Sequence, residues 1–328
     1  MAHIGPHLLG IEGLTREQVD LLLDTSQQFV EVNERSVKKV PTLRGKTIIN
    51  MFLEPSTRTR TSFEIAGKRL SADVVNVSGK DSSVSKGETL IDTAATIQAM
   101  APDVVVLRHS SSGSPHLIAR QVKGIAVVNA GDGLHEHPTQ ALLDALTVRQ
   151  HFGKLDGLAI TFVGDVLRSR VARSDIHLFK LYGCRLRVVA PPTLAVKEFE
   201  AMGVEVHHHM ETALPGSDVV MSLRMKHEYL KDFFIPNLQE YTDQYFISER
   251  VLEKYCPQCV VLAPGPFIRG VEIDSRVIDG PRSLYMAQVG NGVAVRMAVL
   301  LLLSVQGERT QEEKEEQEQS IRQAMGDS

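Results

Sequence analysis

The sequence predicts an α/β protein with two doubly wound parallel sheets, one in each of two domains. First, short β-branched apolar runs alternate with segments of helical periodicity from Lys46 onwards, which is typical of parallel sheets covered by helices on both faces. Second, the runs are apolar throughout, as strands buried on both faces are. Third, 328 residues correspond to two domains at roughly 150 residues per domain.

The first domain is predicted to begin with a helix and to continue with alternating strands and helices. Thr15-Arg-Glu-Gln18 is a capping box, and the helix that it starts extends to about Glu34. The strands are expected at residues 47–53, 74–77, 104–107 and 126–129. The helices between and after them are expected at residues 57–70, 88–100, 115–121 and 138–151.

The second half repeats this alternation after a helix break at Phe152-Gly-Lys-Leu-Asp-Gly157, so the domain boundary is predicted near residues 150–156. Its strands are expected at residues 158–163, 186–189, 204–207, 219–221 and 260–262, and its helices at residues 169–182, 194–202 and 248–255. A closing helix at about residues 288–303 is expected to pack back on the N-terminal domain. The acidic residues after it are predicted to form a solvated or disordered tail.

The net charge of −4 is concentrated in that tail. Residues 307–328 contain seven acidic and three basic residues, which leaves 33 of each in residues 1–306. A neutral body argues against a nucleic-acid partner, whose binding requires a basic excess on one face, although it allows a local cationic pocket. The apolar segment 293–305 contains Arg296 and is expected to be too short to cross a membrane. The N-terminus lacks the features of a signal peptide.

The cysteines favour a cytoplasmic protein without a metal site. Three cysteines cannot all pair, which indicates a reducing compartment. Cys256-Pro-Gln-Cys259 has the spacing of a ligand pair, but a zinc site needs four ligands and no second pair follows. The histidines at 207–209 could complete such a site, although this triple is more typical of a solvated strand end. Ordinary thiols are therefore expected at Cys256 and Cys259.

The most informative segment is Glu54-Pro-Ser-Thr-Arg-Thr-Arg60, which follows a predicted strand and opens a helix. With Ser56 at the N-cap, the next backbone N–H groups would point outward and bind an anion at the positive end of the helix dipole. The hydroxyls of Ser56, Thr57 and Thr59 and the forked guanidinium of Arg58 would complete a phosphate site. The alternative is a well-capped helix with surface arginines, and this segment alone does not decide between them.

Three further polar clusters stand at the carboxyl ends of predicted strands. They are Arg108-His109, the segment 129–140 that includes His137-Pro-Thr-Gln140, and the segment 163–170 that ends at Arg170. Open α/β sheets bind ligands at that edge, so the clusters are expected to take part in ligand binding. A single histidine beside a strand is more often structural, but four clusters at strand ends indicate a binding site.

These motifs resemble those of the carbamoyltransferase family. The shared signatures are Ser56-Thr-Arg-Thr-Arg60, His137-Pro-Thr-Gln140 and Ser85-Lys-Gly-Glu-Thr89. Arg224, the Pro264-Gly-Pro266 loop and the segment 288–296 are similar to the aspartate carbamoyltransferase catalytic chains in particular, whereas ornithine members usually carry a His-Cys-Leu-Pro loop. The resemblance covers about residues 8–303. It implies transfer of a carbamoyl group from carbamoyl phosphate to L-aspartate, an early step of pyrimidine (UMP) biosynthesis, without a cofactor.

The resemblance also implies a role for each matching residue. Carbamoyl phosphate would be bound by Ser56, Thr57, Arg58, Thr59, Arg108, His137, Gln140, Pro264, Gly265 and Pro266. Arg108 would bridge the phosphate and the carbonyl oxygen, which His137 and Thr59 polarise, while Gln140 and the carbonyls of the 264–266 loop orient the carbamoyl NH2. Aspartate would be bound by Arg170, Arg224 and Lys86. The implied catalytic set is Arg58, Thr59, Arg108, His137 and Lys86.

The same resemblance implies an architecture and an assembly. A carbamoyl-phosphate domain would cover residues 1–150 and be completed by the helix at 288–305, an aspartate domain would cover 151–287, and 306–328 would form the tail. A homotrimer with shared active sites is implied, in which a loop with Ser82 and Lys86 enters the neighbouring subunit's site. A dihydroorotase-like or regulatory chain is a further implied partner, whereas a membrane is not.

Two positions depart from the family pattern. Ala263 replaces a His that often precedes the 264–266 loop, which predicts weaker positioning of the carbamoyl group. Lys226 replaces a Gln two residues after Arg224, and its hydrated point charge has a different reach. A transcarbamoylase with another amino-acid acceptor is therefore an alternative. A silent homologue that acts as a scaffold is a second alternative, and the retention of the implied charged residues argues against it.

Overall fold

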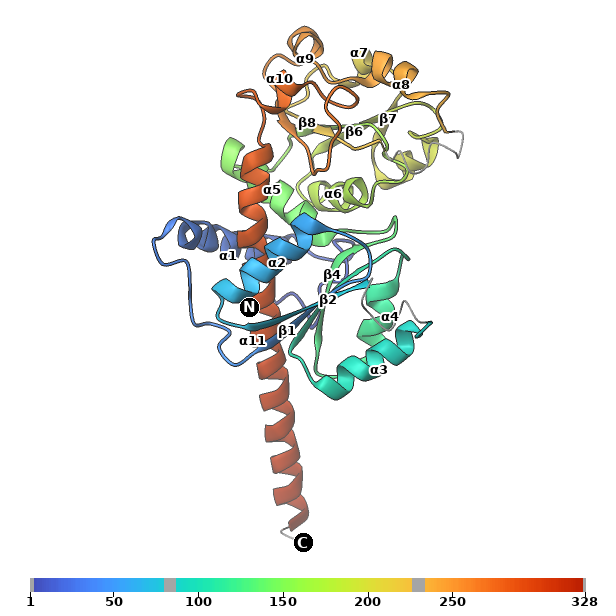
Figure 1. Cartoon of the computed structure of the whole chain (residues 1–328). Coiled ribbons are helices and arrows are strands. Elements are labelled where there is room, and N and C mark those ends of the chain that lie inside the picture. The colour runs from blue at the N-terminus through green and yellow to red at the C-terminus, as the bar shows by residue number, and fades with distance from the viewer. Residues whose placement is uncertain (1–2, 80–86, 226–233, 327–328) are drawn as a thin grey trace. The chain divides into compact units, whose positions relative to one another are not determined.

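The computed structural model describes residues 3–79, 87–225 and 234–326, and describes side chains as far as Val305 (Figure 1). The chain divides into two compact units. The first unit comprises residues 1–10, 17–133 and 293–328, and the second comprises residues 11–16 and 134–292. Each unit contains one parallel sheet, which confirms the predicted fold class.

The first unit contains a four-stranded sheet in the order β2-β1-β3-β4, and all of its pairs are parallel. The strands lie close to their predicted positions: β1 (Thr47–Phe52), β2 (Asp73–Ser78), β3 (Val104–His109) and β4 (Ala126–Asp132). The helices also follow the prediction: α1 (Arg16–Glu34), α2 (Thr57–Arg69), α3 (Leu90–Met100) and α4 (Ser114–Gln121).

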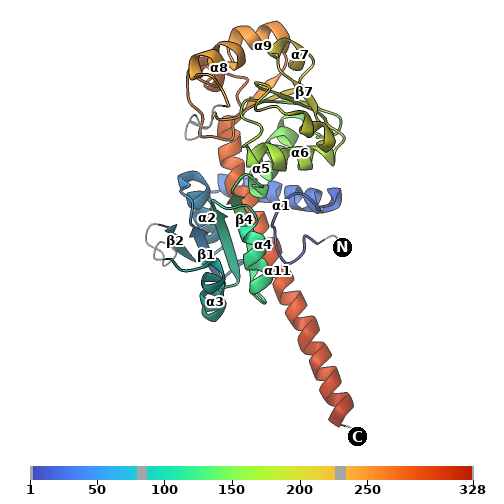
Figure 2. The ribbon, with the colours of Figure 1, turned by 90° about the vertical axis from the view of Figure 1, so that its right-hand side faces the viewer.

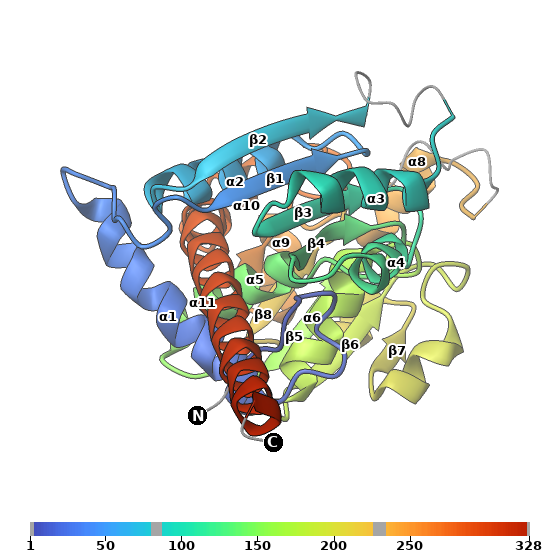
Figure 3. The ribbon, with the colours of Figure 1, turned by 90° about the horizontal axis from the view of Figure 1, so that it is seen from below.

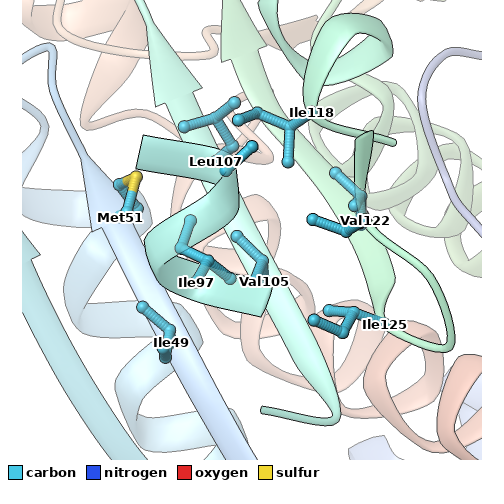
Figure 4. Close-up of a cluster of buried hydrophobic side chains, with 10 residues drawn as sticks. Ile49, Met51, Ile97, Val105, Leu107, Ile118, Val122 and Ile125 are labelled. Atoms are coloured by element: carbon cyan, nitrogen blue, oxygen red, sulfur yellow. The ribbon is translucent and has the colours of Figure 1, made fainter. Parts of the chain in front are cut away.

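Side chains that alternate along β1 and β3 fill a core on each face of this sheet. On one face, Met51 and Leu107 pack against α3 and α4, which supply Ile97 and Ile118 (Figure 4). On the other face lies α2, which reaches the strands because Gly67 has no side chain (Figure 3). A Cβ at this position would lie 2.6 Å from the Val74 side chain. Helices on both faces define the doubly wound arrangement.

The second unit contains a five-stranded parallel sheet in the order β7-β6-β5-β8-β9. Its strands confirm the predicted ones: β5 (Ala159–Val163), β6 (Arg185–Val189), β7 (Glu205–His207), β8 (Val219–Ser222) and β9 (Val260–Leu262). Its principal helices are α5 (Pro138–Phe152) and α6 (Arg170–Lys180), which lie side by side (Figure 2), together with α7 (Met210–Ala213), α8 (Leu238–Tyr245), α9 (Glu249–Tyr255) and α10 (Ser275–Ile278).

Four helices of this unit differ from the prediction, among them the four-residue helices α7 and α10, which were not predicted. The α-helix expected at residues 194–202 is instead a short 3-10 helix, η3 (Lys197–Met202). Val196 before it is extended, at φ −84° and ψ 152°, so only six residues remain for helical turns. Helix α8 was not predicted, although Asn237 caps it by accepting a hydrogen bond from the Glu240 amide at 2.9 Å. An Asn followed three residues later by Glu is a sequence signal for such a start.

The closing helix α11 (Tyr285–Gly326) is longer than predicted at both ends. Within the first unit, Arg296 on this helix donates to Ser62 Oγ at 2.9 Å and lies over the Phe63 ring of α2, at 5.1 Å from its centroid. The expected packing on the N-terminal domain is therefore present. The predicted limits of the domains and of the tail stay predictions.

The apolar part of α11 corrects one expectation from the sequence. The apolar helix begins at Tyr285, before the predicted segment 293–305, and its stretch Tyr285–Val305 has 21 residues, which by length and composition is enough to cross a membrane. However, 61% of its most apolar window is buried inside the protein. This burial is typical of the core helix of a soluble protein.

An acidic side chain lies in the core of the second unit. Asp175 on α6 has no exposed surface, and neither of its carboxylate oxygens has a hydrogen-bond partner among the residues that the structure describes. Burial raises the pKa of Asp175 well above its ordinary value, and the negative charge of Asp144 on α5 raises it further. The folded protein therefore retains the proton of Asp175 to a higher pH than the unfolded chain does.

Replacing this acid with its neutral isostere should change how stability depends on pH. Above about pH 4 the unfolded chain releases the proton of Asp175 whereas the folded chain retains it, so the parent should lose stability as the pH rises towards the folded pKa, by up to about 1.4 kcal/mol per pH unit. Asp175→Asn should lack this loss. Urea unfolding at pH 5 and pH 7 measures it, and an equal difference between variant and parent at both pH values would contradict the prediction.

Candidate functional site

The predicted site residues divide between the two units. Those in the first unit are Ser56, Thr57, Arg58, Thr59 and Arg108. Those in the second unit are His137, Gln140, Arg170, Arg224, Pro264, Gly265 and Pro266. Ser82, Lys86 and Lys226 lie outside the described residues.

In the first unit, the sheet brings the 54–59 segment and Arg108 to one edge. Strands β1 and β3 pair in parallel with Phe52 opposite Arg108, and the Leu53 amide donates to the Arg108 carbonyl at 2.9 Å. The chain leaves β1 for α2 on one face and reaches α4 on the other face after β3. This is the point at which the strand order reverses, where open α/β sheets bind ligands.

The start of α2 has the features expected of an anion site. Ser56 is the N-cap residue, but its hydroxyl makes no capping hydrogen bond. The first intrahelical bond runs from the Arg60 amide to the Ser56 carbonyl at 3.3 Å, so the amides of residues 57–59 have no acceptor within the helix. Arg58 is exposed and makes no hydrogen bond or ion pair with any described residue. These observations favour anion binding over a merely well-capped helix.

Arg108 is held by a carboxylate that the sequence analysis missed. The residue is only 9% exposed. Its Nη2 donates to Glu54 Oε1 at 2.7 Å, and its Nη1 donates to the Ala130 carbonyl at 3.1 Å. Glu54 is the first residue of the 54–60 motif that predicted the site, and this position was the signal in the sequence that could have identified it as a site residue. The pair orients the guanidinium fork towards a fixed direction.

The neighbouring His109 has a structural role. Its Nδ1 accepts from the Ser111 amide at 2.9 Å and lies 3.0 Å from Ser114 Oγ, at the start of α4. Burial lowers the pKa of His109, so the neutral ring that can accept these bonds is favoured. The structural alternative therefore holds for this histidine.

In the second unit, His137 stands at the N-cap of α5 and is 4% exposed. Its imidazole makes no capping bond. Its backbone amide donates to Ser174 Oγ at 2.8 Å, and this hydroxyl donates in turn to Glu136 Oε2 at 2.8 Å. Glu136 also accepts from the Ile11 amide at 2.7 Å. The start of α5, and His137 with it, is thus held by α6 and by a short N-terminal segment.

Gln140 and the loop that follows β9 are connected through one buried carboxylate. Gln140 Nε2 donates to Asp144 Oδ1 at 3.0 Å, and Gln288 Nε2 donates to the same oxygen at 2.6 Å. Gln288 Oε1 accepts from the amide of Ala263, directly before the 264–266 loop, at 2.9 Å. The structure therefore links the two elements that were predicted to orient the carbamoyl NH2.

The predicted aspartate ligands lie at the carboxyl edge of the second sheet. Strands β5 and β8 pair in parallel, and the Leu223 amide donates to the Val163 carbonyl at 2.8 Å, so the chain after β8 places Arg224 beside the loop after β5. Arg170 begins α6 at the end of that loop. Arg170 and Arg224 are both half-buried. The nearby Arg168 is instead buried in an ion pair with Asp165 at 2.7 Å.

Potential metal ligands in the second unit already make hydrogen bonds within the protein. Cys256 and Cys259 are buried and form no disulfide. A hydrogen bond between the two thiols lowers the pKa of Cys259 and raises that of Cys256. Within the described part of the chain, no third ligand gathers with them. Glu12, His135 and Glu136 do lie within ligand distance of one another, but Glu136 already accepts the hydrogen bonds that hold the start of α5.

Two family models match this chain over nearly its whole length. The model described as "Aspartate/ornithine carbamoyltransferase, carbamoyl-P binding domain" matches residues 6–150, and the model described as "Aspartate/ornithine carbamoyltransferase, Asp/Orn binding domain" matches residues 156–303. The chain belongs to the aspartate/ornithine carbamoyltransferase family. The resemblance inferred from the motifs is confirmed.

Relatives of known name are similar to this carbamoyltransferase over most of its length. It is 53% identical over 300 residues to the "Aspartate carbamoyltransferase catalytic subunit" of Sorangium cellulosum, which covers 92% of this chain and 93% of that relative. It is 56% identical over 293 residues to the subunit of the same name from Azorhizobium caulinodans, which covers 89% and 91%.

The solved structures share its fold. Aspartate transcarbamoylase from Trypanosoma cruzi, in complex with carbamoyl phosphate and aspartate, matches with a TM-score of 0.80 at 28% identity and covers 90% of this chain and 95% of that one. Ornithine carbamoyltransferase from Thermus thermophilus matches with a TM-score of 0.80 at 27% identity and covers 92% and 99%.

A glycine in this carbamoyltransferase allows the loop after β5 to approach the segment that carries Arg224. Gly164 has a φ of +120°, which side chains rarely adopt. A Cβ on it would lie 2.6 Å from the Leu223 carbonyl oxygen and 3.0 Å from Tyr241 Oη. Both the backbone conformation and the close approach therefore require glycine.

Replacing Gly164 with alanine should destabilise the protein more than the same change at a glycine in open space. Gly157 is the matched control, because its φ is +70° and a Cβ there would meet nothing within 4 Å. We expect Gly157→Ala to cost about 1 kcal/mol of unfolding free energy, and Gly164→Ala about 2 kcal/mol more, from overpacking against backbone. Equilibrium urea unfolding of the two variants measures the difference, and equal costs would refute the close approach.

Proposed function

We propose that this carbamoyltransferase is an aspartate transcarbamoylase. It transfers the carbamoyl group of carbamoyl phosphate to the amine of L-aspartate and releases N-carbamoyl-L-aspartate and phosphate, as an early step of cytoplasmic pyrimidine biosynthesis. The observation that carries the proposal is the edge of the first sheet, where the open start of α2 and the buried Arg108 adjoin within a family-matched carbamoyl-phosphate domain.

The phosphate of carbamoyl phosphate would bind at the start of α2. The amides of residues 57–59 and the hydroxyls of Ser56 and Thr59 supply donors, and the guanidinium of Arg58 supplies a forked cation. In support, neither the Ser56 hydroxyl nor the Arg58 side chain is engaged with any described residue in a cap or an ion pair. Because phosphate is also the leaving group, the donors that bind it also stabilise the charge that it gains.

The chemical step needs no covalent intermediate with the protein. The neutral amine attacks the carbamoyl carbon, the bond from that carbon to the phosphate oxygen breaks, and the departing phosphate takes the amine proton. Negative charge develops on the carbonyl oxygen, where Arg108, Thr59 and the imidazole of His137 would donate hydrogen bonds. Holding both substrates in a fixed geometry supplies much of the remaining acceleration.

The acceptor is proposed to be aspartate because of its two carboxylates and because of the relatives. Arg170 and Arg224 are half-buried cations at one edge of the second sheet, and each can pair with one carboxylate. The fold does not select the acceptor, since the ornithine enzyme from Thermus thermophilus matches as well as the aspartate enzyme. The curated relatives above 50% identity are named for aspartate, which supports this choice over a different amino acid.

Removing the proposed phosphate fork should abolish turnover. Arg58→Ala should lower the rate of N-carbamoyl-aspartate formation by at least about a thousandfold, since the leaving phosphate loses its cationic donor. Arg60→Ala, two residues along the same helix, is the control and should retain most of the activity. The same assay run with ornithine as acceptor tests the alternative substrate.

Binding of a bisubstrate phosphonate gives an independent measurement. N-(phosphonacetyl)-L-aspartate joins analogues of both proposed substrates, and its binding to the parent should be measurable by isothermal titration calorimetry and much weaker for Arg58→Ala. An Arg58→Ala enzyme with near-parental rate, or a parent that does not bind the phosphonate, would contradict the assignment.

The enzyme is further proposed to act as a homotrimer with shared active sites. Exposed apolar side chains support a subunit contact: Val75 on β2 is 49% exposed, and Ile91 and Met100 on α3 are 52% and 67% exposed. These elements flank the segment with Ser82 and Lys86, which the proposal places in the neighbouring site. A dihydroorotase-like or regulatory partner stays a prediction from the sequence.

Shared sites can be tested by mixing inactive subunits. Arg58→Ala and Lys86→Ala should each be inactive alone, but random mixed trimers contain one site with neither change, so a refolded equimolar mixture should regain about a quarter of parental activity. Sedimentation of the mixture checks that trimers form. A mixture that forms trimers yet stays inactive would contradict site sharing.

A further inference from the structure

A single buried oxygen in the second unit accepts hydrogen bonds from two glutamines. Asp144 on α5 has no exposed surface, and its Oδ1 accepts from Gln140 Nε2 at 3.0 Å and from Gln288 Nε2 at 2.6 Å. Gln140 is 9% exposed and Gln288 is 2% exposed. Three segments far apart in sequence, the start of α5, the start of α11 and the 264–266 loop, are thereby joined through Asp144.

The chemistry of a carboxylate decides how both glutamine side chains are oriented. A glutamine amide has a donor end and an acceptor end, whereas an ionised carboxylate only accepts. Because Asp144 Oδ1 accepts from both glutamines, each of them presents its Nε2 group to this oxygen. As a result, Gln140 Oε1 is turned away from Asp144, and Gln288 Oε1 is directed to the Ala263 amide, from which it accepts at 2.9 Å.

A second buried acid lies on the helix beside Asp144. Asp175 on α6 is fully buried, and its pKa is raised by burial first and by the negative charge of Asp144 second. Neither oxygen of Asp175 has a hydrogen-bond partner among the described residues, so Asp144 is the member of the pair that receives the two glutamine amides.

We propose that Asp144 is a positioning residue that makes the site selective for the NH2 of a carbamoyl group over the methyl of an acyl phosphate. This proposal rests on the proposed function and on the roles that the family resemblance implies for Gln140 and the carbonyls of Pro264 and Gly265, which would face that NH2. Asp144 orients all three acceptors, the first directly and the others through Gln288 and Ala263. Acetyl phosphate has nearly the same shape but offers no donor, so it would leave these acceptors unpaired.

A second polar link between the same helices provides a matched control. Asn291 lies one turn after Gln288 on α11, is 5% exposed, and donates from Nδ2 to Thr147 Oγ1 at 2.9 Å and to Gln150 Oε1 at 2.8 Å on α5. It bonds neither Gln140 nor the 264–266 loop. Asn291→Ala therefore removes a buried link of comparable size without touching the proposed acceptors.

The test compares carbamoyl phosphate with acetyl phosphate in the full-length enzyme. Asp144→Asn retains the shape of the side chain but can both donate and accept, so it no longer dictates the orientation of the two amides. We expect kcat/KM for carbamoyl phosphate to fall at least about tenfold, while the inhibition constant of acetyl phosphate changes by less than about twofold. Gln288→Met, which breaks only the connection to the loop, should give a smaller loss of the same kind, and Asn291→Ala should lower the melting temperature without altering either constant.

The outcomes separate this inference from the proposed function. A parent enzyme that forms no N-carbamoyl-aspartate would overturn the proposed function itself. If the parent is active and Asp144→Asn retains its kcat/KM, or loses affinity for both phosphates equally, as a merely structural defect would cause, the positioning role is wrong. Should Asp144→Asn fail to fold, Gln288→Met decides by the same comparison.

Discussion

The parallel pairing of β1 with β3, and of β5 with β8, is the constraint on which the rest of each unit depends. Parallel strands end at the same edge of a sheet, and the helices that follow these neighbours lie on opposite faces, so the edge between them is left to loops and helix starts. In the first unit this edge receives the start of α2 and Arg108. In the second it receives the loop after β5 and the segment that carries Arg224. The polar residues of each unit are gathered by strand pairing rather than by their separation in sequence.

Buried carboxylates then fix the orientation of the groups that the sheets bring to these edges. Glu136 holds the start of α5 through Ser174, and Glu272, which is 2% exposed, accepts from the Met225 amide beside Arg224 at 2.9 Å. Asp144 orients two glutamines in the same manner. A buried carboxyl group that loses its hydrogen-bond donors is costly, so each of these groups favours the arrangement that supplies them. Buried carboxyl groups of this kind therefore select one orientation of the side chains and backbone amides around them.

The strands, most of the helices and the charged candidate ligands could be predicted from the sequence, whereas the residues that orient these ligands could not. Every strand in the described part of the chain was predicted. Strands such as β3, β4 and β5 are buried along nearly their whole length, and such a strand is an apolar run that is visible locally. The edge strands β2 and β7 are more exposed and were recognised from the strand–helix alternation. The 54–60 motif and Arg108 were recognised because they directly follow such runs. Glu54 and Asp144 were missed as functional residues, since their roles depend on partners that are distant in sequence or on another helix. The 3-10 helix η3 was mistaken for an α-helix because its extended start at Val196 leaves no local mark in composition.

The path of the chain through the two units has a consequence for the order in which they can fold. The second unit is made of residues 11–16 and 134–292, whereas the first also requires residues from Val293 onwards, where Arg296 packs on α2. During synthesis from the N-terminus, every residue of the second unit has therefore emerged before the first unit has its last element. The unit that begins the chain is therefore completed last. Until α11 has been made, the face of α2 that Arg296 covers lacks this contact. This order is the reverse of the usual one, in which the N-terminal domain folds first on the ribosome.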